Sequence, residues 1–211
     1  IESVGIQVIS ANTDGIVMLC PQSLEQTLET TIEHWEDLTG FQTEETRYSA
    51  YYARDVNAYF AVKQDGEVKV KGPYSEVGSA TGTQLDTNPA LLICSDAVKA
   101  LLGKNVPIAD TIAQCRDITR FVTVRNVKGG AHKDGYYLGK VIRWYYATNN
   151  HGTINYIVNN NKVPNTEGAW PCMDLPDAFP SNIDYDWYLK RTNEILEEIN
   201  YLPKKEQLKF W

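Results

Sequence analysis

The stretch Ser10-Ala11-Asn12-Thr13-Asp14-Gly15 decides how the fold of this chain is interpreted. It separates two short β-rich apolar runs, at residues 6–11 and 16–20. Asn, Asp and Gly tolerate the positive φ angles of tight turns, so a tetrapeptide of this kind between two such runs predicts a β-hairpin. Asp14 then projects from the rigid tip of that hairpin.

The residues that follow predict a helix and three strands. Ser23 and Gln26 have the spacing of a capping box, and Gly40 supplies a helix stop, so we expect a helix over 23–39. Its apolar stripe consists of Leu24, Leu28, Ile32, Trp35 and Leu38. Strand-like runs follow at 47–53, 57–63 and 67–71. This order predicts a mixed α+β unit, in which a helix packs on an antiparallel sheet.

A second, smaller α+β unit is expected after a boundary rich in Gly, Ser, Thr, Asn and Pro within residues 72–90, which divides the chain into 1–80 and 81–211. Asn88-Pro89 predicts the start of a helix that Gly103 closes, and Pro107 the start of a shorter helix. Asn182 is expected to cap a final amphipathic helix. Three strands are predicted at 119–127, 136–146 and 154–158, and no regular structure over 164–180.

Composition excludes several classes of protein. The chain has 211 residues, of which 11% are aromatic, and this argues against disorder. No run approaches the ~18 apolar residues of a membrane span, so we expect no membrane partner. The first residue is Ile1, and no basic-then-apolar leader follows it. The sequence therefore predicts a processed chain or, better, a fragment of a larger protein.

The net charge of −7 hides a basic segment. Residues 1–46 contain nine acidic residues and no Lys or Arg, whereas residues 116–143 contain seven basic residues and two acidic ones. The seven are Arg116, Arg120, Arg125, Lys128, Lys133, Lys140 and Arg143. Local charge, and not the average, attracts a polyanion. Residues 116–143 are therefore a candidate for nucleic-acid binding, with an ordinary Gly-rich hairpin in a mildly basic sheet as the alternative.

The four cysteines, at positions 20, 94, 115 and 172, are far apart, and none belongs to a C-x-x-C pair. Such spacing favours reduced, mostly buried thiols over a zinc site or a disulfide framework. We therefore expect a reducing compartment and a cytoplasmic location.

Asp14 is the candidate residue for metal chemistry. Nucleotidyl transfer needs carboxylates that hold two Mg²⁺ ions about 4 Å apart, and one Asp cannot hold both. Asn12 supplies no charge, so a further carboxylate is required. The alternative is that Asn-Thr-Asp-Gly is a structural turn and the chain an unrelated α+β protein.

The order of the motifs resembles family B DNA polymerases of the bacteriophage type. Ser10–Gly15 is similar to their Tyr-x-Asp-Thr-Asp-Ser hairpin, called motif C, and a helix follows it as in their palm domains. Arg54–Tyr59 occupies the place of the Lys-x-Tyr strand, and Lys69–Gly72 looks like the Lys-x-Lys-Gly after it. Residues 139–146 (GKVIRWYY) and 183–188 (IDYDWY) resemble the C-terminal part of these enzymes.

The resemblance implies roles for particular residues. Asp14 matches the metal-binding Asp of the hairpin and is expected to contact the catalytic Mg²⁺, whereas Asn12 and Gly15 replace the first Asp and the Ser. Primer-template DNA and deoxynucleoside triphosphates are the implied partners. Cations on a strand neutralise phosphates without reading sequence. The implied DNA contacts are Arg54, Tyr59, Lys69 and Lys71 in the palm, and Arg125, Lys128, Lys140 and Arg143 in a thumb that grips duplex DNA.

Two further polymerase motifs are not in this sequence: Asp-x-x-Ser-Leu-Tyr-Pro-Ser, which holds the other metal-binding Asp, and the nucleotide-binding Lys helix. The chain is therefore expected to be the second half of a palm plus the thumb region, and not to polymerise without the N-terminal polymerase portion. A phage origin implies the host bacterial cytoplasm. The alternative is a non-catalytic duplex-DNA-binding module or split-polymerase subunit.

Three consecutive aromatic residues, Trp144, Tyr145 and Tyr146, have two possible roles. They stack on bases of a bound nucleic acid, or they belong to the core, as aromatic residues on strands more often do.

Overall fold

The computed structural model describes residues 1–13, 15–75 and 91–201. The chain divides into two compact units, Ile1–Tyr48 and Ser49–Trp211. The boundary expected near residue 80 lies outside the described residues. Within the described ranges, no helix has the length and apolar content to span a bilayer.

The first unit consists of a hairpin and one helix. Strands β1 (Gln7–Ala11) and β2 (Ile16–Leu19) pair antiparallel, with a bulge between Val8 and Ser10, which confirms the predicted hairpin. Helix α1 (Glu25–Thr39) ends at Gly40, whose φ of 73° lies in the left-handed region, as predicted. The predicted capping box is wrong. A 3-10 turn over Gln22–Leu24 leads into the helix and already satisfies the Leu24 N–H at Pro21 O, 2.8 Å away.

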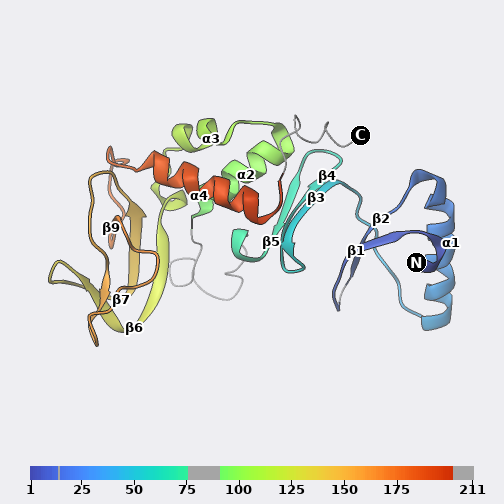
Figure 1. Cartoon of the computed structure of the whole chain (residues 1–211), viewed down its shortest axis with the longest axis horizontal. Coiled ribbons are helices and arrows are strands. Elements are labelled where there is room, and N and C mark those ends of the chain that lie inside the picture. Colours follow the sequence, from blue (N-terminus) through green and yellow to red (C-terminus); the bar gives the residue numbers. More distant parts are fainter. Residues whose placement is uncertain (14, 76–90, 202–211) are drawn as a thin grey trace. The chain divides into compact units, whose positions relative to one another are not determined.

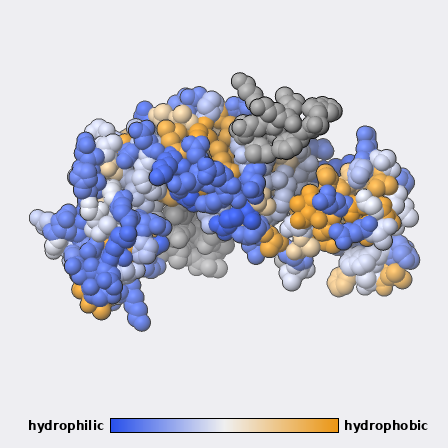
Figure 2. All heavy atoms as spheres, in the orientation of Figure 1, coloured by the Kyte–Doolittle hydropathy of each residue, from blue (hydrophilic) through white to orange (hydrophobic). Residues whose placement is uncertain are grey.

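The surface of this first unit carries several large apolar side chains. Among its described residues, Ile6 is the one apolar side chain that is buried. Figure 2 shows apolar residues gathered on the visible face of residues 1–48. The large apolar side chains that are exposed come from both the hairpin and the helix region: Ile9, Ile16, Leu19, Trp35, Leu38 and Phe41. Two of the five members of the predicted stripe, Trp35 and Leu38, are therefore exposed.

The second unit begins with a three-stranded antiparallel sheet of order β3-β4-β5. Its strands are β3 (Tyr48–Asp55), β4 (Ala58–Lys63) and β5 (Val68–Lys71), close to the three predicted runs. A tight turn joins β4 to β5, in which Gly66 N–H donates to Lys63 O. A short 3-10 helix, Gly72–Tyr74, follows β5.

Three helices join this sheet to a second one (Figure 1). They are α2 (Leu92–Lys104), α3 (Ile108–Gln114) and α4 (Tyr185–Glu198). Helix α2 contacts β4, β5 and both other helices. The start predicted for α2, at Asn88-Pro89, lies outside the described residues.

Helix α4 is capped by Asp184, whose carboxylate accepts a hydrogen bond from Trp187 N–H. The predicted cap, Asn182, is wrong: its carbonyl oxygen accepts from Thr148 N–H, and its side-chain oxygen accepts from the Tyr145 hydroxyl.

The second sheet has the order β8-β6-β7-β9. Strand β7 (Tyr136–Tyr146) has the predicted bounds, whereas β6 (Thr123–Lys133) begins later because Ile118–Arg120 forms a 3-10 turn. Strand β8 is Asn155–Tyr156. Strand β9 (Ala169–Pro171) was not predicted, and it lies within the region expected to have no regular structure.

A continuous core connects the two sheets of the second unit through the helices. Its largest fully buried side chains include Phe60, Ile93, Phe121, Trp144 and Tyr188. Trp144, Tyr145 and Tyr146 are all buried, so they belong to the core and do not form a stacking platform. The fold is α+β with antiparallel sheets, as predicted.

Candidate nucleic-acid interface

One face of the β4–β5 hairpin combines a tyrosine with two lysines. Tyr59 lies opposite Lys71 in the strand register, and Ala61 lies opposite Lys69. Side chains on a strand alternate between its two faces, so Tyr59, Lys69 and Lys71 share one face. The structure therefore brings together three of the eight residues expected to contact DNA.

The reverse face of the same hairpin is buried. Phe60 lies opposite Val70, and Val62 opposite Val68. Phe60 is fully buried and stacks on Tyr74 with ring centroids 5.1 Å apart, and both valines of β5 pack against the core. Burial of this apolar face fixes which way the hairpin is oriented, because a slip of one residue would exchange its two faces. The lysines are consequently held on the outer face.

A second tyrosine extends the outer face to the next strand. The ring of Tyr51, on β3, lies 5.0 Å from the ring of Tyr59, at an interplanar angle of 38°. Both rings are half-buried, Lys69 is exposed and Lys71 is half-buried. We call Tyr51, Tyr59, Lys69 and Lys71 the sheet-face cluster. Tyr51 is not among the residues that the sequence predicted to contact DNA. The alternation of side chains along β3 is the signal that could have identified it, because this alternation places Tyr51 and Tyr52 on opposite faces of the strand.

Gly72 holds the end of this cluster in place. Its φ is +81°, in the left-handed region, and a Cβ atom on it would lie 2.1 Å from the carbonyl oxygen of Asn57. Only glycine lets β5 end this close to the β3–β4 turn. The glycine of the Lys-x-Lys-Gly stretch therefore has a packing role, directly after Lys71.

Arg54 lies away from the sheet-face cluster. Its guanidinium group is 5.8 Å from the ring centroid of Tyr74, which packs on the reverse face, and it pairs with Asp55 at 3.0 Å and Glu198 at 3.8 Å. Hydrogen bonding to Asp55 raises the pKa of Arg54. The structure thus separates Arg54 from Tyr59, Lys69 and Lys71.

Glu198 connects the arginine to helix α4. It accepts hydrogen bonds from the Tyr74 hydroxyl at 2.5 Å and from Arg191 at 2.8 Å. Partial burial would raise the pKa of Glu198, but these hydrogen bonds outweigh it and the pKa is lowered. Burial and the neighbouring Glu198 raise the pKa of Tyr74 to about 12. Arg54, Tyr74 and Arg191 line a cavity of about 570 Å³, and its carboxylates are those of Glu167 and Glu194.

The thumb residues expected to grip DNA are spread over the second sheet. Arg125 lies opposite Ile142, and Arg143 lies opposite Val124. Neighbouring register positions point to opposite faces, so the two arginines are not brought together. Arg125 donates to Pro164 O at 2.9 Å. Lys128 and Lys140 are exposed, and Lys128 lies in the irregular stretch between Asn126 and Ala131.

The remaining cations of residues 116–143 bind groups of the chain itself. Arg116 donates to Ala113 O and Cys115 O, and Arg120 pairs with Asp96 at 2.6 Å. Lys133 is 7% exposed and donates to His151 O at 3.0 Å, and burial lowers its pKa. The net charge of +5 on residues 116–143 therefore overstates the positive charge that this segment presents to a ligand.

At the hairpin of the first unit, Asp14 lies outside the described residues. Asn12 Oδ1 accepts from Gly15 N–H at 2.9 Å, and Asn12 N–H donates to Gly15 O at 3.0 Å. The side chain of Asn12 therefore stabilises the turn, as an Asx residue does. In the described part of the chain, no group of three or more His, Cys, Asp or Glu side chains could hold a metal ion. The described residues alone thus do not make a Mg²⁺ site.

The four cysteines are free thiols, and Cys94 and Cys172 are buried. Burial raises the pKa of Cys94 to about 11, which keeps this thiol protonated and unreactive at neutral pH.

No protein-family model matches the chain, and no curated protein matches it. Within the described residues, the sheet-face cluster is the strongest candidate site, because Tyr59, Lys69 and Lys71 share one outer face of the hairpin.

Proposed function

We propose that the chain is part of a family B DNA-directed DNA polymerase of the bacteriophage type, namely the second half of the palm and the thumb region, and that it holds primer-template DNA. One observation carries this proposal: Tyr59, Lys69 and Lys71 share an outer sheet face whose reverse is packed into the core. A rigid surface that presents cations and hydroxyl donors suits a phosphate backbone.

The cluster would act on the DNA backbone without reading sequence. Lys69 and Lys71 are two positions apart on one strand, which corresponds to roughly 6.6 Å, so both ammonium groups can reach neighbouring phosphates. Tyr59 offers a hydroxyl group that donates to a phosphate oxygen. The cluster contains no Arg, Asn or Gln, whose planar side chains bind base edges through two hydrogen bonds, and a Lys ammonium group acts on phosphates as a point charge. Binding should therefore be independent of sequence and sensitive to salt.

Asp14 would provide one carboxylate of the catalytic centre, at the tip of the β1–β2 hairpin. Mg²⁺ held there, with further ligands from the N-terminal polymerase portion, supplies activation of the primer hydroxyl and stabilisation of the leaving pyrophosphate. Asn12 takes no part as a ligand in this proposal, because its amide oxygen accepts from Gly15 N–H.

A second candidate is a non-catalytic duplex-DNA-binding module or split-polymerase subunit. The observation in its favour is that the sheet-face cluster is formed wholly within Ser49–Trp211, without the hairpin of the first unit. DNA binding by this surface therefore does not require Asp14.

Fluorescence anisotropy with a labelled primer-template duplex tests the binding surface. Each phosphate contact contributes about 0.9 to the slope of log K against log salt, so the double variant Lys69→Gln/Lys71→Gln should lower that slope by about 1.8. The matched control is Lys104→Gln/Lys190→Gln, which removes the same charge from exposed positions on α2 and α4. Equal losses in both double variants, or no binding at low salt, would contradict the proposal.

Primer extension with the N-terminal polymerase portion supplied separates the two candidates. Asp14→Ala should abolish extension and leave duplex binding intact, whereas Asp110→Ala, at an exposed position on α3, should leave both unchanged. Full extension by Asp14→Ala would refute the catalytic role. Duplex binding without any extension by the wild-type chain would favour the binding module.

A further inference from the structure

Three large apolar side chains are exposed at the C-terminal end of helix α1. They are Trp35 and Leu38 on the helix and Phe41 directly after Gly40, with exposed fractions of 47%, 72% and 67%. Trp35 and Leu38 are three positions apart, so they lie on neighbouring turns of one helix face. We call Trp35, Leu38 and Phe41 the α1-end patch.

The patch is ordered by contacts that follow the helix. Gly40 adopts the left-handed conformation, and the chain beyond it turns back towards the helix. Thr43 then donates its N–H and its hydroxyl to the Glu36 carboxylate, at 2.5 and 2.7 Å. The rings of Trp35 and Phe41 stack, with centroids 5.9 Å apart and an interplanar angle of 16°. A ligand would not have to order this surface on binding, which lowers the cost of association.

Packing inside the first unit does not cover the patch. Among the described residues of this unit, Ile6 is the one buried apolar side chain. Apolar residues gather instead on the surface of residues 1–48 (Figure 2). Large apolar side chains gain free energy when they leave water, and a group of them on a surface marks an interaction site.

The unit that carries the patch is strongly acidic. Residues 1–48 contain nine acidic residues and a single basic one, Arg47, which gives a formal net charge of −8. Arg47 itself pairs with Glu25 and Glu45. The carboxylates of this unit therefore far outnumber the cations that could neutralise them.

Several of these carboxylates are sequence neighbours of the patch. Asp37 lies between Trp35 and Leu38 in the helix, and Glu44 follows Phe41 by three positions. Both acidic side chains are exposed. The patch is thus an apolar surface with negative charge beside it.

This combination selects among the possible occupants. Two copies of the chain would bring two units of charge −8 together, and nucleic acids and anionic lipids would be repelled in the same way. A cationic protein surface is attracted, and its Lys or Arg groups can also stack on the exposed indole. Trp35 and Leu38 form part of an i, i+3 ridge, and such ridges pack against the side-chain rows of another helix.

We propose that the α1-end patch binds an amphipathic helix of a partner protein, whose apolar stripe is flanked by Lys or Arg. The apolar side chains of that helix pack on Trp35, Leu38 and Phe41, and its cations lie near Asp37 and Glu44. The proposal does not rest on the polymerase assignment, because it uses neither Asp14 nor the sheet-face cluster.

Isothermal titration calorimetry tests the proposal with the full chain and a blocked peptide of about 18 leucine and lysine residues, whose leucines form one helical stripe. The wild-type chain should bind this peptide at least tenfold more tightly than a peptide of the same composition with its leucines scattered around the helix. Trp35→Ala should weaken binding by about tenfold or more, as expected for an aromatic anchor. Circular dichroism checks that the variant is folded.

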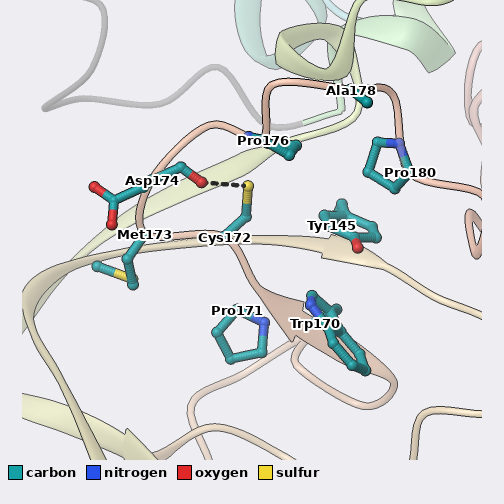
Figure 3. A pocket seen from close by; sticks show the side chains of 9 residues that line it. All are labelled: Tyr145, Trp170, Pro171, Cys172, Met173, Asp174, Pro176, Ala178 and Pro180. Atoms are coloured by element: carbon teal, nitrogen blue, oxygen red, sulfur yellow. Dashed lines mark hydrogen bonds between the residues drawn. The ribbon is translucent and has the colours of Figure 1, made fainter.

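Trp170 in the second unit provides the matched control. Its side chain is 46% exposed, and it borders a proline-lined groove of about 450 Å³ beside β9 (Figure 3). Tyr145 in that groove is buried, so Trp170 is the exposed aromatic ring there. Trp170→Ala should leave peptide binding unchanged. Equal weakening by Trp35→Ala and Trp170→Ala would contradict the proposal.

Charge reversal provides a second test that leaves the apolar patch intact. Asp37→Lys/Glu44→Lys should weaken binding of the leucine-lysine peptide and improve binding of a leucine-glutamate peptide with the same stripe. Asp110→Lys/Asp177→Lys makes the same change of charge at exposed positions of the second unit and should have a smaller effect. Equal effects of the two double variants would mean that net charge alone attracts the peptide, which would overturn the proposal.

Three further results would overturn it. The first is lack of wild-type binding at millimolar peptide. The second is self-association in sedimentation that Trp35→Ala abolishes, because a second copy would then be the occupant. The third is flotation with phosphatidylcholine vesicles that Trp35→Ala abolishes, because a membrane surface would then be the occupant.

Discussion

Gly103 in the last turn of α2 lies against Gly66 in the β4–β5 turn. A Cβ atom on Gly103 would lie 2.3 Å from the carbonyl oxygen of Gly66 and 2.9 Å from a methyl carbon of Val68. The sequence predicts that Gly103 ends the helix, but α2 continues to Lys104, and Asn105 adopts the left-handed conformation after it. The glycine therefore permits close packing of helix and hairpin, and this contact supports the strand that carries Lys69 and Lys71.

Gly103→Ala should destabilise the chain despite the better helix propensity of alanine. Propensity favours Ala by about 1 kcal/mol, whereas overpacking against backbone costs typically about 1–3 kcal/mol. Because the clash is with a backbone oxygen, the cost lies in the upper part of that range, and we expect a net loss of up to about 2 kcal/mol in the free energy of unfolding by urea. Lys104→Ala, at the exposed neighbouring position, should change stability little. An increase in stability for Gly103→Ala would show that the hairpin moves away at no cost.

Tyr74→Phe should weaken the attachment of α4 to the first sheet of its unit. The variant removes the hydroxyl that donates to Glu198 across 124 residues of sequence. Hydrogen bonds to charged groups contribute about 1.5–3 kcal/mol, so we expect a loss near the lower end of that range in urea unfolding at neutral pH. An unchanged unfolding midpoint would mean that Arg191 and Arg54 stabilise Glu198 sufficiently by themselves.

The hydrogen-bonded pair Tyr74 and Glu198 makes the stability of the chain depend on pH at both acidic and alkaline values. The pKa of Glu198 is lowered from 4.5, so its contribution is present above pH 4.5 and is lost as the pH falls through the folded-state value. The pKa of Tyr74 is raised from 10.0 to about 12, so the folded state loses stability as the pH rises over that interval. Tyr74→Phe should flatten the alkaline limb of a stability-pH profile. A profile that stays parallel to the wild type would contradict this assignment.

Tyr188→Phe should be among the more destabilising single-atom changes in the core. The Tyr188 hydroxyl donates to Phe121 O at 2.8 Å and accepts from Tyr146 N–H at 3.0 Å, and the side chain is fully buried. Its removal leaves two buried backbone groups without this partner, which costs about 1–3 kcal/mol. Differential scanning calorimetry measures the effect. A loss smaller than that of Tyr185→Phe, a partly buried neighbour, would show that the hydroxyl contributes little.

Arg54→Gln should act on stability and not on DNA binding. Its guanidinium group pairs with Asp55 and Glu198 and lies over Tyr74, away from the sheet-face cluster. Urea unfolding should show a small loss at most, since the side chain is partly exposed and solvent screens its ion pairs. The salt slope of duplex binding should stay at the wild-type value, in contrast to Lys71→Gln. A lower slope would place Arg54 on the DNA, as the resemblance to the polymerases implies.

Local patterns explain why most elements were predictable. The Asn12 side chain closes the β1–β2 turn by accepting from Gly15 N–H, Gly66 has a φ of +86° in the β4–β5 turn, and the runs on either side alternate as strands do. Strand β9 was not predicted because three residues, the last of them a proline, have no periodicity. It forms only where the backbone of Trp170 meets that of Tyr145. The α4 cap was misplaced because Asn182 and Asp184 are both good capping residues, and Asn182 binds Tyr145 and Thr148 instead.

The α+β class, the β1–β2 hairpin and the common face of Lys69 and Lys71 follow from the sequence, because turn residues and side-chain alternation along a strand are local properties. Tertiary structure alone decided that Tyr59 faces Lys71, that Arg54 turns towards Glu198 and that Arg125 and Arg143 leave opposite faces. It also placed Trp170 beside Tyr145 to form the proline-lined groove. Register, ion pairs and grooves depend on contacts between residues far apart in the chain, which no local pattern contains.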